Sequence, residues 1–262
     1  MKAGGTQFAC WSVADWRMLH DAVREAPPTA VIVVDPYLGT DDGTVAPELD
    51  ALIEEFPYAS VVAAVRLRQA DGSPAPLREL SMRGISEIIL VGLEDTPPAI
   101  RRILNLAQGR FLKELLRRIL PPYVTGRARV VLMAGAVALS AGGHAPDMAR
   151  ALAVSPKTLI RWCERVYLPP PRRVLAWIRV LLAAELLDDP SRTVSGVARA
   201  CGYTSDTALR RALLDFLAVG PTQLRETGAM AVASRTFLRE LAELRDAGRR
   251  QARARRSPRS RA

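Results

Sequence analysis

The second half of the chain reads Val197-Ala198-Arg199-Ala200-Cys201-Gly202-Tyr203-Thr204-Ser205-Asp206-Thr207-Ala208-Leu209, which has the form of a helix-turn-helix. A short helix with a buried-type alanine is followed by a tight turn and by a second helix that begins on polar residues. About fifty residues earlier the same form appears in Asp147-Met148-Ala149-Arg150-Ala151-Leu152-Ala153-Val154-Ser155-Pro156-Lys157-Thr158-Leu159. One match could arise by chance, but two in tandem at nearly the same internal spacing predict a chain that reads duplex DNA.

The second helix of the earlier unit is expected to have one apolar and one polar side. Ser155 suits its N-cap, and Pro156 suits the first helical position, where the missing N–H costs nothing. The expected buried stripe follows helical spacing and consists of Leu159, Trp162, Cys163 and Val166. The side that would enter a major groove carries Lys157, Thr158, Arg161 and Arg165. For each of these charged side chains, the alternative is that it lies on a solvent-exposed helix face and does not contact DNA.

The later unit follows the same plan, with Gly202 at the turn. Its expected buried stripe is Leu209, Ala212, Leu213 and Phe216. Its exposed side carries Asp206, Thr207, Arg210 and Arg211. The helix dipole stabilises an acidic side chain near the start of a helix. For Asp206, a role in capping the helix is therefore an alternative to a contact with a DNA base.

One continuous apolar-rich helix is predicted between the units, over 172–187, and it ends at Asp188-Asp189-Pro190. A rigid helix there would fix the distance between the two recognition helices. Two major grooves on one face of DNA lie about 34 Å apart, one helical turn. A single chain is therefore expected to read two adjacent half-sites without dimerising.

Charge is distributed unevenly along the 262 residues, whose net charge is +10. Residues 1–110 carry 10 basic and 15 acidic side chains, whereas residues 111–262 carry 27 basic and 12 acidic ones. A basic half joined to an acidic half is typical of a nucleic-acid-binding domain attached to one that does not bind nucleic acid.

The basic half resembles the output domain of the AraC/XylS family of bacterial transcription regulators over about residues 128–226. The marks of that family's second unit appear here as Val197-Ala198, Gly202-Tyr203, Leu209-x-x-x-Leu213 and Pro221-Thr222-Gln223-Leu224-Arg225. The family usually has glycine three residues before that proline, where this chain has Ala218, with Gly220 adjoining Pro221. The resemblance implies a sequence-specific regulator that binds double-stranded operator or promoter DNA, with RNA polymerase as a further candidate partner.

The first half alternates between strand and helix patterns. The strands are expected at 7–11, 29–34, 60–65 and 87–91, and the helices at 15–25, 47–56, 76–83 and 98–119. Continuous apolar strands separated by helices predict a parallel sheet that is covered on both faces.

This order resembles the flavodoxin-like receiver domain of bacterial response regulators in truncated form. In receivers the phosphoacceptor ends the third strand, and Asp35 holds that position here. Only 34 residues precede Asp35, so we expect the first strand and helix of a receiver to be missing, together with their acidic pair for Mg²⁺. The lysine after the last receiver strand is also missing, because the chain reads Gly92-Leu93-Glu94-Asp95 there. Without that cation and metal a phosphoryl group has little charge compensation, so we expect regulation or dimerisation through an exposed sheet edge, without phosphotransfer.

The sequence contains no pattern typical of catalysis, metal binding or cofactor binding. Cys10, Cys163 and Cys201 form no C-x-x-C pair, and neither His20 nor His144 has a ligand cluster at suitable spacing. There is no glycine-rich phosphate loop, so we expect no catalytic site, metal or cofactor. The most hydrophobic run, 130–141, is too short to span a membrane, and the sequence leads us to expect no secretory leader. We therefore expect a cytoplasmic, nucleoid-associated protein.

The expected organisation has four parts. They are a receiver-like α/β domain at 1–120, a linker at 121–127, an all-α tandem helix-turn-helix domain at 128–228, and a segment at 229–262 that is helical and then disordered. The disordered part is expected after Asp246, where the chain has seven arginines and no acid. Two alternatives stay open: a response regulator switched by phosphorylation of Asp35, and a non-specific architectural DNA-binding protein that relies on the basic tail.

Overall fold

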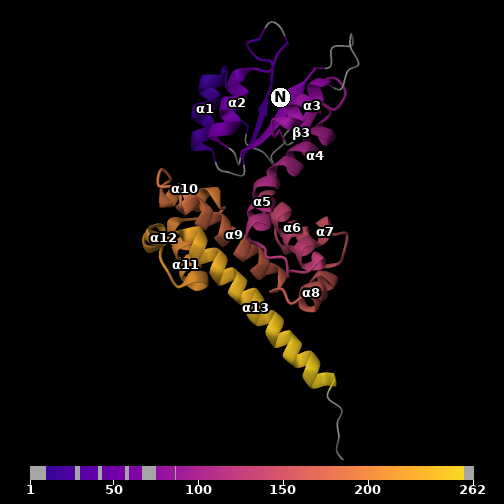
Figure 1. Ribbon diagram of the computed structural model, residues 1–262, viewed down its shortest axis with the longest axis vertical. Coiled ribbons are helices and arrows are strands. Elements are labelled where there is room, and N and C mark those ends of the chain that lie inside the picture. The colour runs from indigo at the N-terminus through magenta and orange to yellow at the C-terminus, as the bar shows by residue number, and fades with distance from the viewer. Residues whose placement is uncertain are drawn as a thin grey trace, which may run out of the picture. The chain divides into compact units, whose positions relative to one another are not determined.

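The computed structural model describes residues 10–26, 30–40, 43–56, 59–66, 75–85 and 87–256 (Figure 1). The chain divides into two compact units, 1–111 and 112–262. The division lies ahead of Pro121-Pro122, near which the sequence predicts the domain boundary. Among the described residues no single helix is long and apolar enough to cross a membrane; only a pair bent by 119° passes that test by length and composition.

The N-terminal unit contains a parallel sheet of three described strands. They are β1 (Val31–Val34), β2 (Ser60–Val65) and β3 (Glu87–Leu90), and they lie in the order β1-β2-β3. Val34 pairs with Ala63, and Val65 pairs with Leu90. The strands expected at 29–34, 60–65 and 87–91 are thus confirmed as strands of a parallel sheet. Most of the expected strand at 7–11 lies outside the described residues, and Cys10 and Trp11 are not in a strand.

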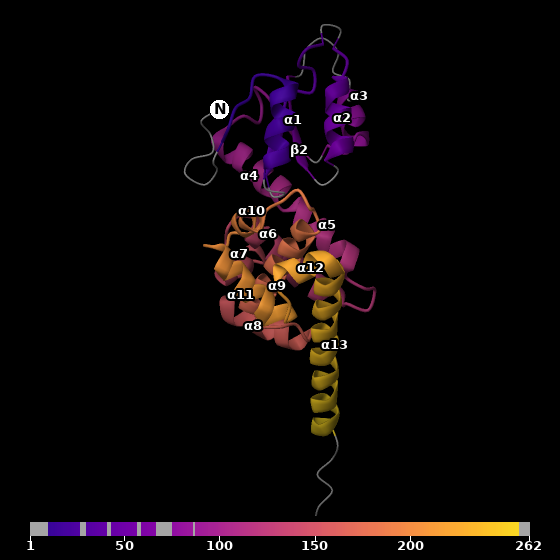
Figure 2. The same ribbon diagram turned by 90° about the vertical axis from the view of Figure 1, so that its left-hand side faces the viewer.

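Helices cover both faces of this sheet, as continuous apolar strands require. On one face Val23 of α1 (Trp16–Glu25), Leu49 of α2 (Pro47–Glu55) and Leu80 of α3 (Ala75–Met82) join one core cluster with strand residues. On the other face Ile103 and Ala107 of α4 (Pro97–Gln108) pack against Val62 and Ile89. In Figure 2, α1 and α2 lie in front of the strands and α4 lies behind them.

The single long helix predicted over 98–119 is wrong. The segment forms two helices, α4 and α5 (Arg110–Ile119), which are separated at Gly109. Glycine is a weak helix former. In addition, the buried residues of the two helices belong to different hydrophobic cores. Ile103 of α4 packs on the sheet, whereas Leu112 and nearly all of α5 belong to the C-terminal unit.

Every described element of the C-terminal unit is a helix, as the sequence predicts. After α5 the chain forms α6 (Gly126–Ser140), α7 (Ala145–Ala151), α8 (Pro156–Arg165), α9 (Pro171–Leu187), α10 (Val194–Ala200), α11 (Asp206–Leu217), α12 (Pro221–Thr227) and α13 (Ala229–Arg256). The continuous helix predicted between the two motifs is confirmed as α9, which is buried along most of its length. It packs closely on α6, since a Cβ on Gly135 would stand 2.7 Å from the Ile178 side chain.

The expected disorder after Asp246 is also wrong for the residues that the structure describes. α13 continues without a break to Arg256, and residues 257–262 lie outside the described part. The N-terminal two thirds of α13 pack on the unit through residues such as Ala233, Phe237 and Leu241. Once a helix is fixed in this way each further residue propagates it cheaply, and alanine, arginine and glutamine are good helix formers.

Ala218, which stands where the sequence resemblance leads one to expect glycine, adopts the left-handed conformation that favours glycine. Ala218 has φ 58° and caps α11, with its N–H donating to the Leu214 carbonyl over 2.9 Å. A residue with a Cβ adopts this conformation at a cost of roughly 1–2 kcal/mol. Gly220 adjoins Pro221 with an extended φ of −81°, so it does not substitute for the missing glycine.

Ala218→Gly is therefore expected to stabilise the C-terminal unit by about 1 kcal/mol, measured from the midpoint of urea unfolding. Ala231→Gly, on the exposed side of α13, is the matched control. That position is right-handed helix, where glycine is expected to cost about 1 kcal/mol. Equal destabilisation by both substitutions would contradict the left-handed conformation at Ala218.

Candidate DNA-binding interface

The turns of the two helix-turn-helix units share one hydrogen-bonding pattern. In the first unit the N–H of Ala153 donates to the Arg150 carbonyl and that of Val154 donates to the Ala149 carbonyl, each over 3.0 Å. In the second unit Gly202 and Tyr203 make the equivalent bonds, over 3.0 and 2.9 Å. Ala153 and Gly202 both have positive φ, 52° and 71°. The two units are therefore built alike, although only one has glycine at the turn.

A serine N-cap begins each recognition helix. The Ser155 hydroxyl accepts a hydrogen bond from the Thr158 N–H, and the Ser205 hydroxyl accepts one from the Ala208 N–H, each over 3.1 Å. Each bond satisfies an N–H that would otherwise lack an intrahelical partner. Because Ser205 is the cap, Asp206 is left in the first turn, where it is half-buried and stabilised by the helix dipole.

The structure places most of the predicted α8 residues on its exposed side. Leu159 and Cys163 are buried, while Trp162 and Val166 are half-buried. Lys157, Arg161 and Arg165 are exposed. Thr158 differs: it is half-buried, and its hydroxyl lies 2.8 Å from that of Ser155, so it takes part in the cap.

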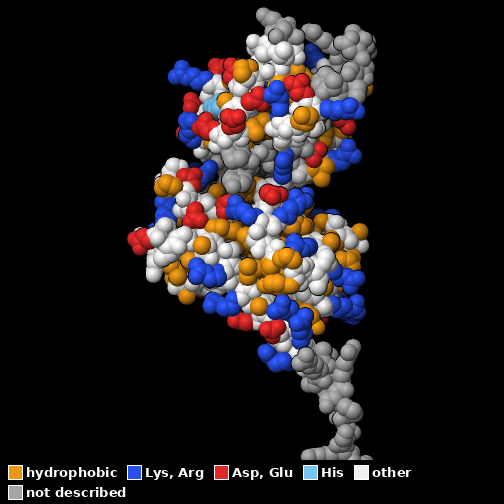
Figure 3. All heavy atoms as spheres, viewed as in Figure 1, with side chains coloured by type: hydrophobic (Ala, Val, Ile, Leu, Met, Phe, Trp, Pro, Cys, Tyr) orange, Lys and Arg blue, Asp and Glu red, His pale blue; other side chains and the backbone are white. Residues whose placement is uncertain are grey.

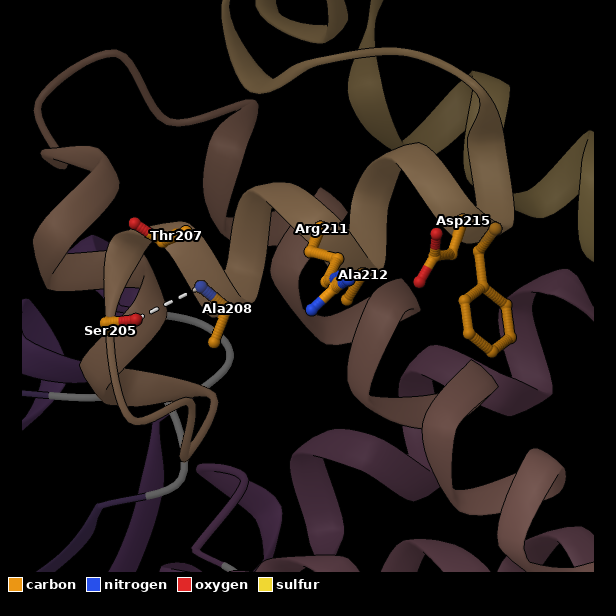
Figure 4. Close-up of a pocket in the computed structure, with 7 residues that line it drawn as sticks. Ser205, Thr207, Ala208, Arg211, Ala212 and Asp215 are labelled. Atoms are coloured by element: carbon orange, nitrogen blue, oxygen red, sulfur yellow. Dashed lines mark hydrogen bonds between the residues drawn. The ribbon is translucent and has the colours of Figure 1, made fainter.

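On α11 the predicted side is also exposed. Leu209 and Leu213 are fully buried, whereas Thr207, Arg210 and Arg211 are exposed. A hollow runs along this helix and is lined by Ser205, Thr207, Ala208, Arg211, Ala212, Asp215 and Phe216 (Figure 4). In the described part of the chain, none of the five arginine and lysine side chains predicted on α8 and α11 forms an ion pair, so their charges are available to a polyanion.

Two exposed apolar residues on the recognition helices were not among the predicted site residues. Ile160 is 46% exposed and lies three residues from Lys157, within one helical turn; Leu214 is 54% exposed and lies three residues from Arg211. The sequence signal was available, because both fall outside the buried stripes. Apolar side chains at such positions can contact a thymine methyl group in the major groove.

Helix α9 holds both units. Val174 and Ile178 pack toward α6, and α9 contacts α7 and α8 of the first unit and α10, α11 and α12 of the second. The Trp177 ring meets the Phe216 ring of α11 edge-on at 4.8 Å between centroids. The Arg179 guanidinium lies 5.8 Å from the centre of the Tyr203 ring. The turn and the recognition helix of the second unit are thus both fixed to α9.

The Pro-x-x-x-Arg segment closes the second unit. Arg225 of α12 donates a hydrogen bond to the Arg192 carbonyl, in the loop before α10. Pro221 and Leu224 are buried beneath it. The arginine of this motif is therefore used inside the fold and not on the exposed sides of α8 and α11.

Lysine and arginine are prominent on the surface of the C-terminal unit. Figure 3 shows these side chains, in blue, around the lower part of that unit, with fewer acidic ones in red. This agrees with the excess of basic residues in the second half of the sequence. A surface of this kind attracts the phosphate backbone and makes affinity depend on salt.

The two buried cysteines make stability sensitive to alkaline pH. Burial raises the pKa of the Cys163 thiol to about 11 and that of the Cys201 thiol to about 12, from an ordinary value of 9.0. Because the folded chain holds these protons more tightly than the unfolded chain, the stabilisation is complete below pH 9 and is lost as pH rises toward 11–12. Each thiol is expected to lower the free energy of unfolding by about 1 kcal/mol at pH 10.

We expect the Tm of the C-terminal unit to fall between pH 8 and pH 10.5 and expect Cys201→Ala to flatten that fall. Cys10→Ala, at an exposed position in the other unit, should leave the pH dependence unchanged. Calorimetry across this pH range measures both effects. A Cys201→Ala chain with the wild-type pH dependence would show that this thiol does not contribute.

In the N-terminal unit Asp35 directly follows β1 and is exposed. Its carboxylate accepts a hydrogen bond from the Tyr37 N–H over 3.0 Å. Across residues 10–256, wherever the structure describes them, no three His, Cys, Asp or Glu side chains gather as a metal site. A carboxylate at the carboxyl end of a parallel strand is accessible to a small molecule, but nothing described beside Asp35 supplies a metal site.

Comparison with known protein families adds to this geometry. Residues 148–227 match the family model described as a helix-turn-helix domain. The matched segment begins in α7, ends with α12 and contains both recognition helices. No curated protein and no solved structure gives a significant match. The match therefore supports an AraC-type helix-turn-helix domain over residues 148–227 and a role for this part of the chain in binding DNA.

Proposed function

We propose that the chain is a sequence-specific transcription regulator that reads two adjacent major grooves, one with α8 and one with α11. The observation that carries this proposal is the pair of equivalent turns, each leading into a serine-capped helix that packs on the same helix α9. The proposed DNA-contacting residues are Lys157, Thr158, Arg161 and Arg165 on α8, and Asp206, Thr207, Arg210 and Arg211 on α11.

These side chains suit different parts of DNA. Arg161 and Arg210 are exposed within the first two turns of their helices, where a side chain reaches guanine edges in the groove. Arg165 stands at the last position of α8, where a helix leaves the groove, and suits a phosphate. Thr207 and Ile160 offer methyl groups to thymine.

For the N-terminal unit we propose a receiver-like module that regulates or dimerises the protein without phosphotransfer. The strand order β1-β2-β3 agrees with the last three strands of the flavodoxin-like order 2-1-3-4-5, and Asp35 then follows the third strand of that order. We propose the bounds 1–120 for this part, 121–127 for a linker and 128–228 for the DNA-reading domain, with α5 at the end of the first part packed on the C-terminal unit. The edge of β1 that no described strand covers is the proposed contact with a second copy. RNA polymerase is a further proposed partner, and the cytoplasmic nucleoid is the proposed location.

Selection of binding sites from random duplexes by the full chain tests the proposed function. The expected result is a bipartite motif whose half-site centres lie about one helical turn apart. Enrichment of no motif, with an affinity that follows salt alone, would instead favour a non-specific architectural protein. Incorporation of phosphate from a small phosphodonor with Mg²⁺, lost in Asp35→Ala, would favour a phosphorylation-switched regulator.

A further inference from the structure

Helix α13 lies beyond the segment that matches the family and is anchored at its start to the end of α9. The carboxylate of Asp188 accepts hydrogen bonds from the Ala229 N–H over 2.6 Å and from the Met230 N–H over 3.0 Å. Asp188 is also the C-cap of α9. One side chain therefore joins the end of the central helix to the beginning of α13.

The middle of α13 is fixed to the middle of α9. Glu240 accepts hydrogen bonds from Trp177 Nε1 over 2.9 Å and from Arg173 over 2.7 and 2.6 Å. Phe237 is fully buried, with its ring 5.3 Å from that of Trp177. Because this half-buried carboxylate is satisfied by three donors, the contact sets the direction of α13 and its register on α9.

The far part of α13 reaches the first helix-turn-helix unit. Gly248 lies directly against the ring of Tyr167, which follows the C-cap of α8, so closely that a Cβ would stand 2.1 Å from the ring. Nearby, the Arg245 guanidinium lies 4.8 Å from the centre of the Tyr123 ring. α13 thus spans from the end of the second unit to the end of the recognition helix of the first.

Beyond Gly248 the helix continues to Arg256, and in both Figure 1 and Figure 2 it extends past α8. In the sequence this stretch carries arginine at positions 249, 250, 253, 255 and 256. Arg249 and Arg250 are exposed, and Asp246 is the one acid in the sequence from 244 to 262. A helix that presents the exposed Arg249 and Arg250 next to the end of a recognition helix is complementary to the phosphates that border the groove.

We propose that residues 249–256 form a basic arm that binds the DNA backbone beside the half-site read by α8. The proposal rests on the proposed function, because it takes duplex DNA as the partner. The arm differs from a flexible charged tail, since Gly248 and Glu240 fix the direction in which it leaves the domain. The footprint on DNA is therefore asymmetric and extends further on the α8 side than on the α11 side.

Flank length and a matched pair of variants test the arm in the full-length chain. Affinity is measured on duplexes that end at the selected site or continue for one helical turn on either side. Arg249→Ala and Arg249→Pro remove the same charge, but only proline removes a helical N–H and clashes with the carbonyl of residue 245. Circular dichroism and Tm of both variants confirm that the rest of the fold is intact.

The expected result is a gain in affinity of about tenfold from the flank on the α8 side alone, with a salt dependence steeper by about one unit for each added phosphate contact. Arg249→Ala should keep most of that gain, and Arg249→Pro should lose it. Equal gains from both flanks, or equal behaviour of the two variants, would overturn the rigid arm while leaving the two-groove reader in place. A wild-type chain with no preference for any duplex sequence would overturn the proposed function, and the arm with it.

Discussion

Arg161→Ala is expected to weaken binding to the selected site roughly 5- to 150-fold, the equivalent of the 1–3 kcal/mol that a bidentate arginine–guanine contact supplies. Arg161 is exposed in the second turn of α8, on the side opposite the buried Leu159 and Cys163. The loss of affinity should be confined to one half-site, because α8 and α11 are proposed to contact different half-sites. Fluorescence anisotropy on the selected site and on single base-pair variants of it measures both the loss and its position.

Arg117→Ala is the matched control for this substitution. Arg117 is also exposed and lies in the same unit, on α5, where it pairs with Glu114 over 3.2 Å. We expect less than a twofold loss from it, since an exposed pair of this kind contributes little. An Arg161→Ala chain that binds all sequences more weakly by the same factor would place Arg161 on a phosphate instead of a base.

Phe237→Ala is expected to destabilise the C-terminal unit by about 3–5 kcal/mol, the usual cost of deleting a fully buried aromatic ring. Phe237 is fully buried on α13 and packs against Trp177 in the middle of α9. In a unit of this size the loss corresponds to a fall in Tm of about 10 °C, measured as the C-terminal transition by calorimetry. This result would show that α13 belongs to the folded domain even though it lies outside the family match.

Leu214→Ala is the matched control for Phe237→Ala. It removes a large apolar side chain from α11, but one that is more than half exposed. Its cost should stay within about 0.5 kcal/mol. If Phe237→Ala were equally mild, α13 would not be packed on α9 in solution.

Local sequence signals are sufficient to predict the helices of the C-terminal half. Ser155 and Ser205 are short polar residues placed directly before apolar-periodic runs, and both cap the helices that the sequence predicts. The linker helix followed from a long apolar run between clear start and stop residues. Capping and periodicity act over a few residues, so a sequence reader can see them without knowing the tertiary structure.

The two wrong predictions concern segments whose structure depends on distant packing. Gly109 sits in an otherwise regular amphipathic pattern, and periodicity alone does not show that the residues on either side belong to different cores. The run after Asp246 has the composition of a disordered tail. Its helical state follows from Phe237 and Glu240, which fix the preceding turns on α9 and so provide the costly nucleus.

At the candidate site the sequence identified the exposed sides but not the finer roles. Exposure of Arg161, Arg210 and Arg211 follows directly from the buried stripes beneath them. The hydroxyl contact between Thr158 and Ser155 depends on rotamers that no spacing rule specifies. Ile160 is not predicted by the pattern of charged and polar residues on α8, although thymine offers an apolar group that it can contact.

The most direct test of the account is to insert base pairs between the two half-sites of the selected site and to measure the affinity again. This shows whether one rigid chain holds both recognition helices at a fixed distance. Helices α9 and α13 each contact both helix-turn-helix units, so the separation of α8 and α11 is fixed. Insertion of five base pairs, or of ten, which restores the same face of DNA, is expected to reduce affinity to that of a single half-site. Wild-type affinity after the ten-base-pair insertion would contradict a fixed pair of readers within one chain.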